Sequence, residues 1–134
     1  MSKFIKLIVR TPLKTFYEGK IKELMTETTE GGRSILPNHA PLIAILRPNI
    51  TIIIEDNGEE KEFFCSSGVL RVNKDETEIL CDAAEWPAEI DEQRAESSLK
   101  RAEQRLKKED RIDKERAELA LKRAMNRIKA SKIK

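Results

Sequence analysis

Short apolar segments separated by turn residues fill the first two thirds of the chain. Most of these segments are rich in Ile, Val and Leu, which favour strands. Glu18-Gly19 is predicted as a turn, Glu30-Gly31-Gly32 as a loop, and Asp56-Asn57-Gly58 as the turn of a hairpin. Many short strands with frequent turns predict a β-sandwich or a barrel. The predicted strands cover residues 3–10, 20–28, 42–46, 50–55, 61–65, 69–73 and 77–81.

The pattern changes beyond residue 86, where Ala, Glu, Lys, Arg and Leu dominate and favour helices. Residues 90–102 match residues 112–124 at a constant shift of 22 positions. Asp91 and Asp113 occupy the N-cap position of the two copies, so each copy is predicted to be one helix. The link over residues 107–112 is short, which predicts antiparallel neighbours. The fold class is therefore α+β, with a β domain at residues 1–86 and an antiparallel two-helix hairpin at residues 87–134.

Each predicted helix carries an apolar stripe beside a stripe of arginines, when its residues are placed 100° apart. The apolar stripes hold alanines at alternate levels, which lets two helices approach closely. The apolar residues are Ala95, Leu99, Ala102 and Leu106 in the first copy, and Ala117, Leu121, Ala124 and Ile128 in the second. The other stripe holds Arg94, Ser98, Arg101 and Arg105 in the first copy, and Arg116, Ala120, Arg123 and Arg127 in the second.

Both arginine rows are predicted to share one face of the hairpin, because the repeat relates the two helices by an axis perpendicular to their common plane. Apart from Asp91 and Asp113, neither row has an acidic partner on its own helix. Guanidinium groups that converge in this way form an anion site. A solvated basic face, or a surface that docks on the acidic β domain, remains an alternative at this point.

Charge is distributed unevenly between the two predicted domains. Residues 1–89 carry 15 acidic and 11 basic side chains, whereas residues 90–134 carry 9 acidic and 15 basic side chains. A basic helical segment (the basic arm) attached to an acidic β domain is expected to bind a negatively charged partner or ligand. Cys65 and Cys81 lie in apolar segments and are expected to be reduced, buried thiols, and no metal site is predicted. The N-terminal residues lack the apolar core of a secretion signal, so a cytosolic protein is expected.

Four segments occur in a recognisable order along the chain. They are Thr11-Pro12 with Tyr17-Glu18-Gly19, then Ile35-Leu36-Pro37-Asn38-His39-Ala40-Pro41-Leu42, then Ser67-Gly68-Val69-Leu70, and finally Ala83-Ala84-Glu85 leading into Ile90-Asp91-Glu92-Gln93-Arg94-Ala95. Together they resemble the epsilon subunit of bacterial F-type ATP synthases over the whole chain. The run Ala120-Leu121-Lys122-Arg123-Ala124-Met125-Asn126-Arg127 resembles the bacillus-like, ATP-binding members of that family.

The resemblance implies a sandwich of about ten strands and a non-catalytic place on the central rotor stalk. The implied partners are the gamma subunit, the c-subunit ring through the loop around Glu30, His39 and Leu42, and the catalytic head of alpha and beta subunits when the hairpin is extended. The extended hairpin would hinder ATP hydrolysis, and ATP would favour the folded state. The implied location is the cytoplasmic face of the bacterial plasma membrane, as a peripheral subunit.

The resemblance also implies a set of ATP-contacting positions, with the arginines on the phosphates and the region of Ile90 and Asp91 on the base and sugar. ATP would be a regulatory ligand, with no catalytic residue and no metal required. The positions are Glu85, Ile90, Asp91, Arg94, Ala95, Arg101, Arg123 and Arg127.

Ser34 and Asn38 stand where the family usually has glycine, and Asn tolerates a left-handed backbone better than Ser. Two alternatives to the ATP-responsive rotor subunit remain. One is the same rotor subunit with an inhibitory hairpin but no useful affinity for ATP. The other is a nucleic-acid-binding module that uses the basic arm, although the aromatic content of 4% and the lack of a known reading motif count against it.

Overall fold

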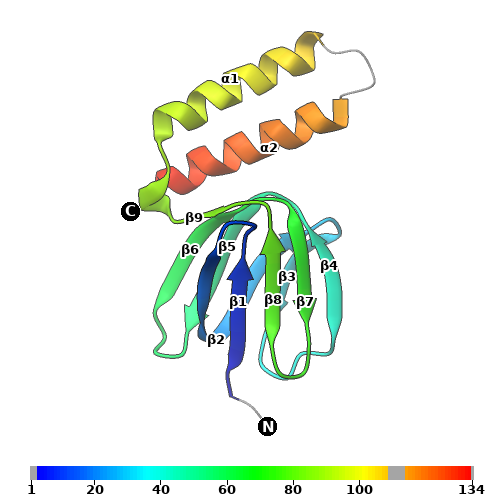
Figure 1. The fold of residues 1–134 in the computed structure, drawn as a ribbon, viewed down its shortest axis with the longest axis vertical. Coiled ribbons are helices and arrows are strands. Elements are labelled where there is room, and N and C mark those ends of the chain that lie inside the picture. Colours follow the sequence, from blue (N-terminus) through cyan, green and yellow to red (C-terminus); the bar gives the residue numbers. More distant parts are fainter. Residues whose placement is uncertain (1–2, 109–113, 134) are drawn as a thin grey trace. The chain divides into compact units, whose positions relative to one another are not determined.

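The computed structural model describes residues 3–108 and 114–133, which form two compact units, Met1–Ala84 and Glu85–Lys134. The first unit is built of strands and the second of helices (Figure 1). The division falls two residues before the boundary at 86/87 expected from the sequence. The predicted α+β class is confirmed. Within the described residues no helix combines the length and apolarity needed to cross a membrane.

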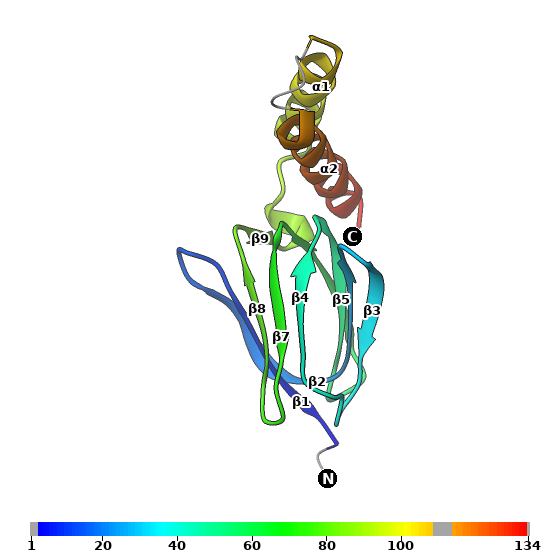
Figure 2. The same cartoon turned by 90° about the vertical axis from the view of Figure 1, so that its right-hand side faces the viewer.

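The described residues form nine strands, compared with about ten expected. Figure 2 shows β7 and β8 in a different layer from β3 and β5. The strand order is β1-β8-β7-β4-β2-β5-β6-β9, and β2 also pairs with β1 and β3. The described pairs among β1 to β8 are antiparallel except β1 with β8. The bounds are β1 Ile5–Arg10, β2 Thr15–Thr28, β3 Gly31–Ile35, β4 Leu42–Leu46, β5 Asn49–Glu55, β6 Glu60–Cys65, β7 Gly68–Val72, β8 Thr77–Cys81 and β9 Ala84–Glu85.

The interior of the sandwich follows the alternation of apolar positions along the strands. In β7, for example, Leu70 and Val72 are buried, whereas Val69 and Arg71 are exposed. Thr51 Oγ1 donates to Asn49 Oδ1 at 2.9 Å, so these two buried polar side chains satisfy each other inside the core. The largest fully buried apolar side chains are Phe63, Phe64, Leu7, Ile21, Leu24, Ile35, Leu46, Ile53, Leu70, Ile79 and Val9.

Two local predictions were wrong. Glu18 and Gly19 do not form a turn but lie within β2, opposite Ile8 and Leu7 of β1. The chain reverses earlier, where Thr11 N–H donates to the carbonyl oxygen of Lys14 at 2.9 Å. Gly31 and Gly32, predicted as a loop, begin β3.

The helical unit contains a short 3₁₀ turn, Pro87–Glu89, followed by α1, Glu92–Lys108, and α2, Lys114–Ser131. Figure 1 shows α1 and α2 running side by side, as predicted for an antiparallel hairpin. The Asp91 cap is confirmed, because its Oδ1 accepts from Arg94 N–H at 3.2 Å. The predicted cap Asp113 and the link around Ile112 lie outside the described residues.

Candidate functional site

A seam of small residues holds α1 and α2 together. Ala95 and Ala102 of α1, and Ala117 and Ala124 of α2, are each at most 4% exposed. The larger residues of the same stripes are only half-buried. Alanine at these levels lets the two backbones approach closely, which fixes the arginines beside the seam relative to one another.

The segment before α1 is held by its own hydrogen bonds. Glu89 N–H donates to the carbonyl oxygen of Trp86 at 2.9 Å, and the Glu89 carboxylate accepts from Trp86 N–H at 3.0 Å. Asp91 then caps α1, with its carbonyl oxygen accepting from Ala95 N–H at 3.0 Å. These contacts place Ile90 and Asp91 at the N-terminus of the helix, one turn before Arg94.

A pocket of about 300 Å³ lies at this end of the hairpin, and we call it the Glu85 pocket. It contains every predicted ATP-contacting position except Arg123, so seven of the eight predicted residues line one cavity. Glu89 and Ser98 also line it and were not predicted as site residues, although Ser98 lies on the predicted arginine stripe. The lining residues are Glu85, Glu89, Ile90, Asp91, Arg94, Ala95, Ser98, Arg101 and Arg127.

Arg127 and Glu85 form an ion pair in the Glu85 pocket. Arg127 Nε donates to Glu85 Oε1 at 2.8 Å, and the two side chains are 31% and 29% exposed. An ion pair with this exposure contributes about 1 kcal/mol or less to stability. Its main effect is to hold the guanidinium of α2 at the wall of the pocket, beside the N-terminal end of α1.

A second cavity of about 280 Å³, which we call the arginine groove, lies between the two helices. Arg101 and Arg105 of α1 line it together with Arg123 and Arg127 of α2, so the two arginine rows share one face as predicted. Small residues form the rest of its lining: Ser98, Ala102, Ala120 and Ala124. Arg101, Arg127 and Ser98 belong to both cavities, and Arg101 Nη2 donates to Ser98 Oγ at 3.2 Å.

The two cavities differ in charge. The Glu85 pocket has three carboxylates, from Glu85, Glu89 and Asp91, alongside its three arginines. The arginine groove has four arginines and no carboxylate in its described lining. A polyanion therefore fits the groove, whereas the Glu85 pocket offers carboxylate acceptors to a group with N–H and O–H donors.

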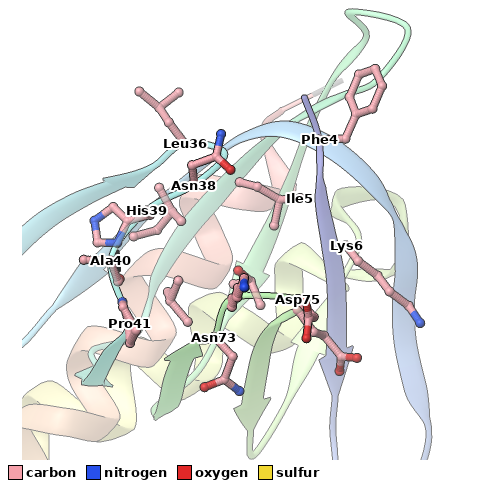
Figure 3. Close-up of a pocket in the computed structure, with 15 residues that line it drawn as sticks. Phe4, Ile5, Lys6, Leu36, Asn38, His39, Ala40, Pro41, Asn73 and Asp75 are labelled. Atoms are coloured by element: carbon pink, nitrogen blue, oxygen red, sulfur yellow. Dashed lines mark hydrogen bonds between the residues drawn. The ribbon is translucent and has the colours of Figure 1, made fainter. Parts of the chain in front are cut away.

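The predicted partner loop lies in the sandwich, where it lines a pocket of about 460 Å³. Figure 3 shows His39, Ala40 and Pro41 along one side of this pocket, and Ile5 and Lys6 along another. His39 Nδ1 lies 2.6 Å from the carbonyl oxygen of Ala40. Asn38 has φ 66°, a left-handed backbone conformation that Asn tolerates better than most residues.

The backbone at Ser34 is different. Ser34 lies in β3, and Asn38 is the only non-glycine residue with positive φ in the described chain. Ser34 Oγ donates to Glu23 Oε2 at 2.7 Å on the neighbouring strand. Serine is therefore accommodated without strain at this position.

Two family models together match almost the whole chain. The model described as the ATP synthase Delta/Epsilon chain beta-sandwich domain matches residues 4–87, and the model described as the Delta/Epsilon chain long alpha-helix domain matches residues 88–132. The ATP synthase epsilon chain of Clostridium novyi (strain NT) is 55% identical over 112 residues, covering 84% of this chain and 86% of its own. The ATP synthase epsilon chain of Clostridium acetobutylicum is 53% identical over 107 residues, covering 80% of each.

Solved structures with the same fold come from ATP synthases. A chain in the Euglena gracilis mitochondrial ATP synthase OSCP/F1/c-ring structure has a TM-score of 0.83 at 20% identity, covering 98% of this chain and 82% of that one. A chain in the Tetrahymena thermophila mitochondrial ATP synthase central stalk/c-ring structure has a TM-score of 0.63 at 21% identity, covering 97% of each. At these identities the likeness concerns the fold.

Proposed function

Because the chain belongs to the family of ATP synthase delta/epsilon chains, as a stalk subunit that is not an enzyme by itself, we propose that its helical hairpin regulates the synthase by binding ATP. ATP binds the folded hairpin and favours that state, and the extended hairpin reaches the alpha and beta subunits of the catalytic head and hinders hydrolysis. ATP is a ligand here and not a substrate.

The observation that carries the ATP proposal is the Glu85 pocket with the adjoining arginine groove. Seven of the eight residues expected to contact ATP line the pocket, and the eighth, Arg123, lines the groove. We propose that the phosphates lie toward the groove, where the guanidiniums of Arg101, Arg123 and Arg127 bind them, together with Arg94 from the adjoining Glu85 pocket. The base and ribose lie in the Glu85 pocket, where Glu85 and Asp91 accept hydrogen bonds from amino and hydroxyl groups. The arginines supply the positive charge, so no metal is required.

The free energy of ATP binding sets how strongly ATP can act as a switch. A ligand at a concentration 100-fold above its dissociation constant stabilises the state that it binds by about 2.7 kcal/mol. That is enough to take a hairpin divided equally between two states to about 99% of the bound form. A hairpin that is only 1% folded without ATP needs about 5.5 kcal/mol of differential binding to become 99% folded. The ATP affinity therefore decides how far the equilibrium moves.

Isothermal titration of the full chain with ATP, ADP and inorganic triphosphate tests the ligand proposal. Arg94→Ala and Arg127→Ala are expected to weaken ATP binding by at least 10-fold each, since each removes charge-assisted hydrogen bonds worth about 1.5–3 kcal/mol. Lys100→Ala is the matched control, because Lys100 is exposed on α1 and lines neither cavity. The absence of any binding heat with the unaltered chain at millimolar ATP would refute the proposal.

The alternative is the same stalk subunit with an inhibitory hairpin and no useful ATP affinity. The ion pair between Arg127 and Glu85 favours it, because this contact gives Arg127 a structural role. The two functions predict different results for Arg127→Ala. If this variant lowers the melting temperature of the hairpin and leaves the response to nucleotide unchanged, the alternative is correct.

The sandwich is proposed to join the hairpin to the rotor, bound to the gamma subunit and to the c-subunit ring at the cytoplasmic face of the membrane. An exposed apolar patch on β4, β7 and β8 supports a protein partner such as gamma. Ile45 lies opposite Val69, and Val69 lies opposite Leu80, so their side chains share a face of the sheet. Ile43 and Ile45 are 71% and 61% exposed, which is typical of an interface.

The loop around Glu30, His39 and Leu42 is proposed to contact the c-ring. Leu36, within the same loop, is 53% exposed, and Glu30 has a side chain that is 81% exposed. A photo-activated cross-linking residue placed at position 39 is expected to capture a c subunit in the assembled complex. The same residue at position 60, on β6, is the control. Equal capture from both positions would contradict the proposed contact.

A further inference from the structure

Ser98 of α1 lies where the two cavities of the hairpin adjoin, and the proposed function gives it no role. The Glu85 pocket and the arginine groove share Ser98, Arg101 and Arg127 in their linings. Ser98 is half-buried, whereas the preceding residue, Ser97, is exposed and lines neither cavity. A ligand that extends from the pocket into the groove therefore lies against Ser98.

The internal repeat shows that helix packing does not require a hydroxyl at this position. Serine is a poorer helix former than alanine, because its hydroxyl competes for backbone hydrogen bonds. The residue of α2 that corresponds to Ser98 is Ala120, which also lines the arginine groove. Alanine is therefore accommodated at this level of the arginine stripe, and the hydroxyl of Ser98 is a feature of the first helix alone.

The hydrogen bond between Arg101 and Ser98 determines how the serine hydroxyl can act on a ligand. Arg101 Nη2 donates to Ser98 Oγ at 3.2 Å. A guanidinium carries only donors, so the serine oxygen is the acceptor in this bond and its own O–H keeps the capacity to donate. Phosphate oxygens are acceptors, so the hydroxyl and the guanidinium can donate to the same phosphate chain.

We propose that the Ser98 hydroxyl is a further ligand-binding group of the hairpin, and that it donates a hydrogen bond to the phosphate chain of ATP between the Glu85 pocket and the arginine groove. This inference rests on the proposed binding of ATP. With the base and ribose in the pocket and the phosphates toward the groove, the phosphates nearest the ribose lie beside the residues that both cavities share. The bond from Arg101 holds the guanidinium beside the hydroxyl before the ligand arrives, which reduces the cost of ordering these side chains on binding.

Isothermal titration of full-length variants with ATP tests the role of Ser98. Ser98→Ala is expected to weaken ATP binding by about 3- to 10-fold, the typical effect of losing one hydrogen bond. Ser97→Ala is the matched control, because it makes the same replacement at the neighbouring exposed position. Both replacements favour the helix, so a change in helix stability alone would affect the two variants alike. Ser98→Thr keeps the hydroxyl and is expected to retain most of the affinity.

The outcomes separate this inference from the proposed function. If the unaltered chain binds ATP and Ser98→Ala binds it as tightly as Ser97→Ala does, the role of Ser98 is overturned and the proposed function stands. If the unaltered chain gives no binding heat, the proposed function is refuted and the inference with it. Circular dichroism establishes that each variant has the helical content of the unaltered chain before titration.

Deoxynucleotides identify the part of ATP that the hydroxyl contacts. The fold-loss caused by Ser98→Ala is measured with ATP, with 2′-deoxy-ATP and with 3′-deoxy-ATP. A hydrogen bond to the phosphate chain does not depend on the ribose hydroxyls, so the same fold-loss is expected with all three nucleotides. A loss that disappears with either deoxynucleotide would show that Ser98 contacts the ribose, and it would overturn the assignment to the phosphates.

Discussion

Gly68 lies where β7 meets β8, and replacing it with alanine is expected to separate the two strands. A Cβ at this position would lie 2.1 Å from the carbonyl oxygen of Leu80, and 2.7 Å and 2.9 Å from Cα and Cβ of Cys81. Carbon atoms in favourable contact are about 3.5–4.0 Å apart, so the strands must move by about 1 Å or more. The obstacle is backbone on the facing strand, which cannot rotate away as a side chain can.

The cost of Gly68→Ala follows from what the movement breaks. Overpacking of this kind costs about 1–3 kcal/mol. The hydrogen bond from Asp82 N–H to Ser67, next to the glycine, and that from Ser66 N–H to Ala83 would also be strained, at about 0.5–1.5 kcal/mol each. The expected loss is therefore about 2–6 kcal/mol in the free energy of unfolding.

Urea unfolding followed by circular dichroism measures this loss, and Gly32→Ala is the matched control. A Cβ on Gly32 would meet only the carbonyl oxygen of Thr26, at 4.0 Å. Gly32→Ala should therefore be neutral, or stabilising by up to about 1 kcal/mol, because alanine restricts the unfolded chain. The reasoning would be refuted if both variants unfolded at the same urea concentration as the unaltered protein.

Three further substitutions test other parts of the structure. Tyr17 OH donates to Glu55 Oε2 at 2.8 Å, and this hydrogen bond lowers the pKa of the Glu55 carboxyl group. The bond therefore stabilises the folded state fully above the unfolded pKa of Glu55, which is about 4.3. That stability is lost as the pH falls through the lower pKa of the folded state. Tyr17→Phe should cost about 1 kcal/mol at pH 7, and urea titrations should show the difference shrinking below about pH 4. Ala124→Leu should destabilise the hairpin by about 1–3 kcal/mol in helical circular dichroism melts, because Ala124 is 2% exposed, whereas Met125→Leu at a 54% exposed position should change little. Asn38→Ala should lower the free energy of unfolding by about 1–2 kcal/mol because its φ is 66°, and Asn38→Gly should retain nearly full stability in the same urea assay.

The strands of the sandwich could be predicted where neighbouring residues in the sequence determine a turn. Asp56-Asn57-Gly58 forms the expected hairpin turn, with Gly58 at φ 87°. Glu18-Gly19 carried an equally plausible turn signal and was misjudged. There the missing side chain of Gly19 makes room for Tyr17, whose hydroxyl oxygen would lie 2.8 Å from a Cβ. A glycine needed for close packing cannot be told from a turn glycine by sequence spacing alone.

The arginine face could be predicted because helical periodicity fixes which residues share a stripe. Periodicity could not supply the ion pair between Glu85 and Arg127, which are 42 residues apart and lie in different elements. Glu89 was missed for the same reason, because it belongs to the 3₁₀ turn before α1 and has no place on the helical wheel. Glu85 and Glu89 thus come from the segment that precedes the repeat, whereas the third carboxylate of the Glu85 pocket, Asp91, belongs to the repeat and was predicted.

In the proposed function, that segment also favours one end of the repeated structure as the site of the nucleotide base. The internal repeat relates each residue of the first copy to the residue 22 positions later, and the arginines are preserved by this shift. The counterparts of Glu85 and Glu89, however, are Lys107 and Arg111, which reverse the charge. Two of the three carboxylates of the Glu85 pocket are therefore replaced by cations at the corresponding positions of the second copy, whereas Asp91 keeps an acidic counterpart in Asp113. If the arginine face were symmetric, the proposed ATP could bind with its phosphates in either of two orientations. We propose that Glu85 and Glu89, which have no acidic counterparts in the second copy, favour one of them.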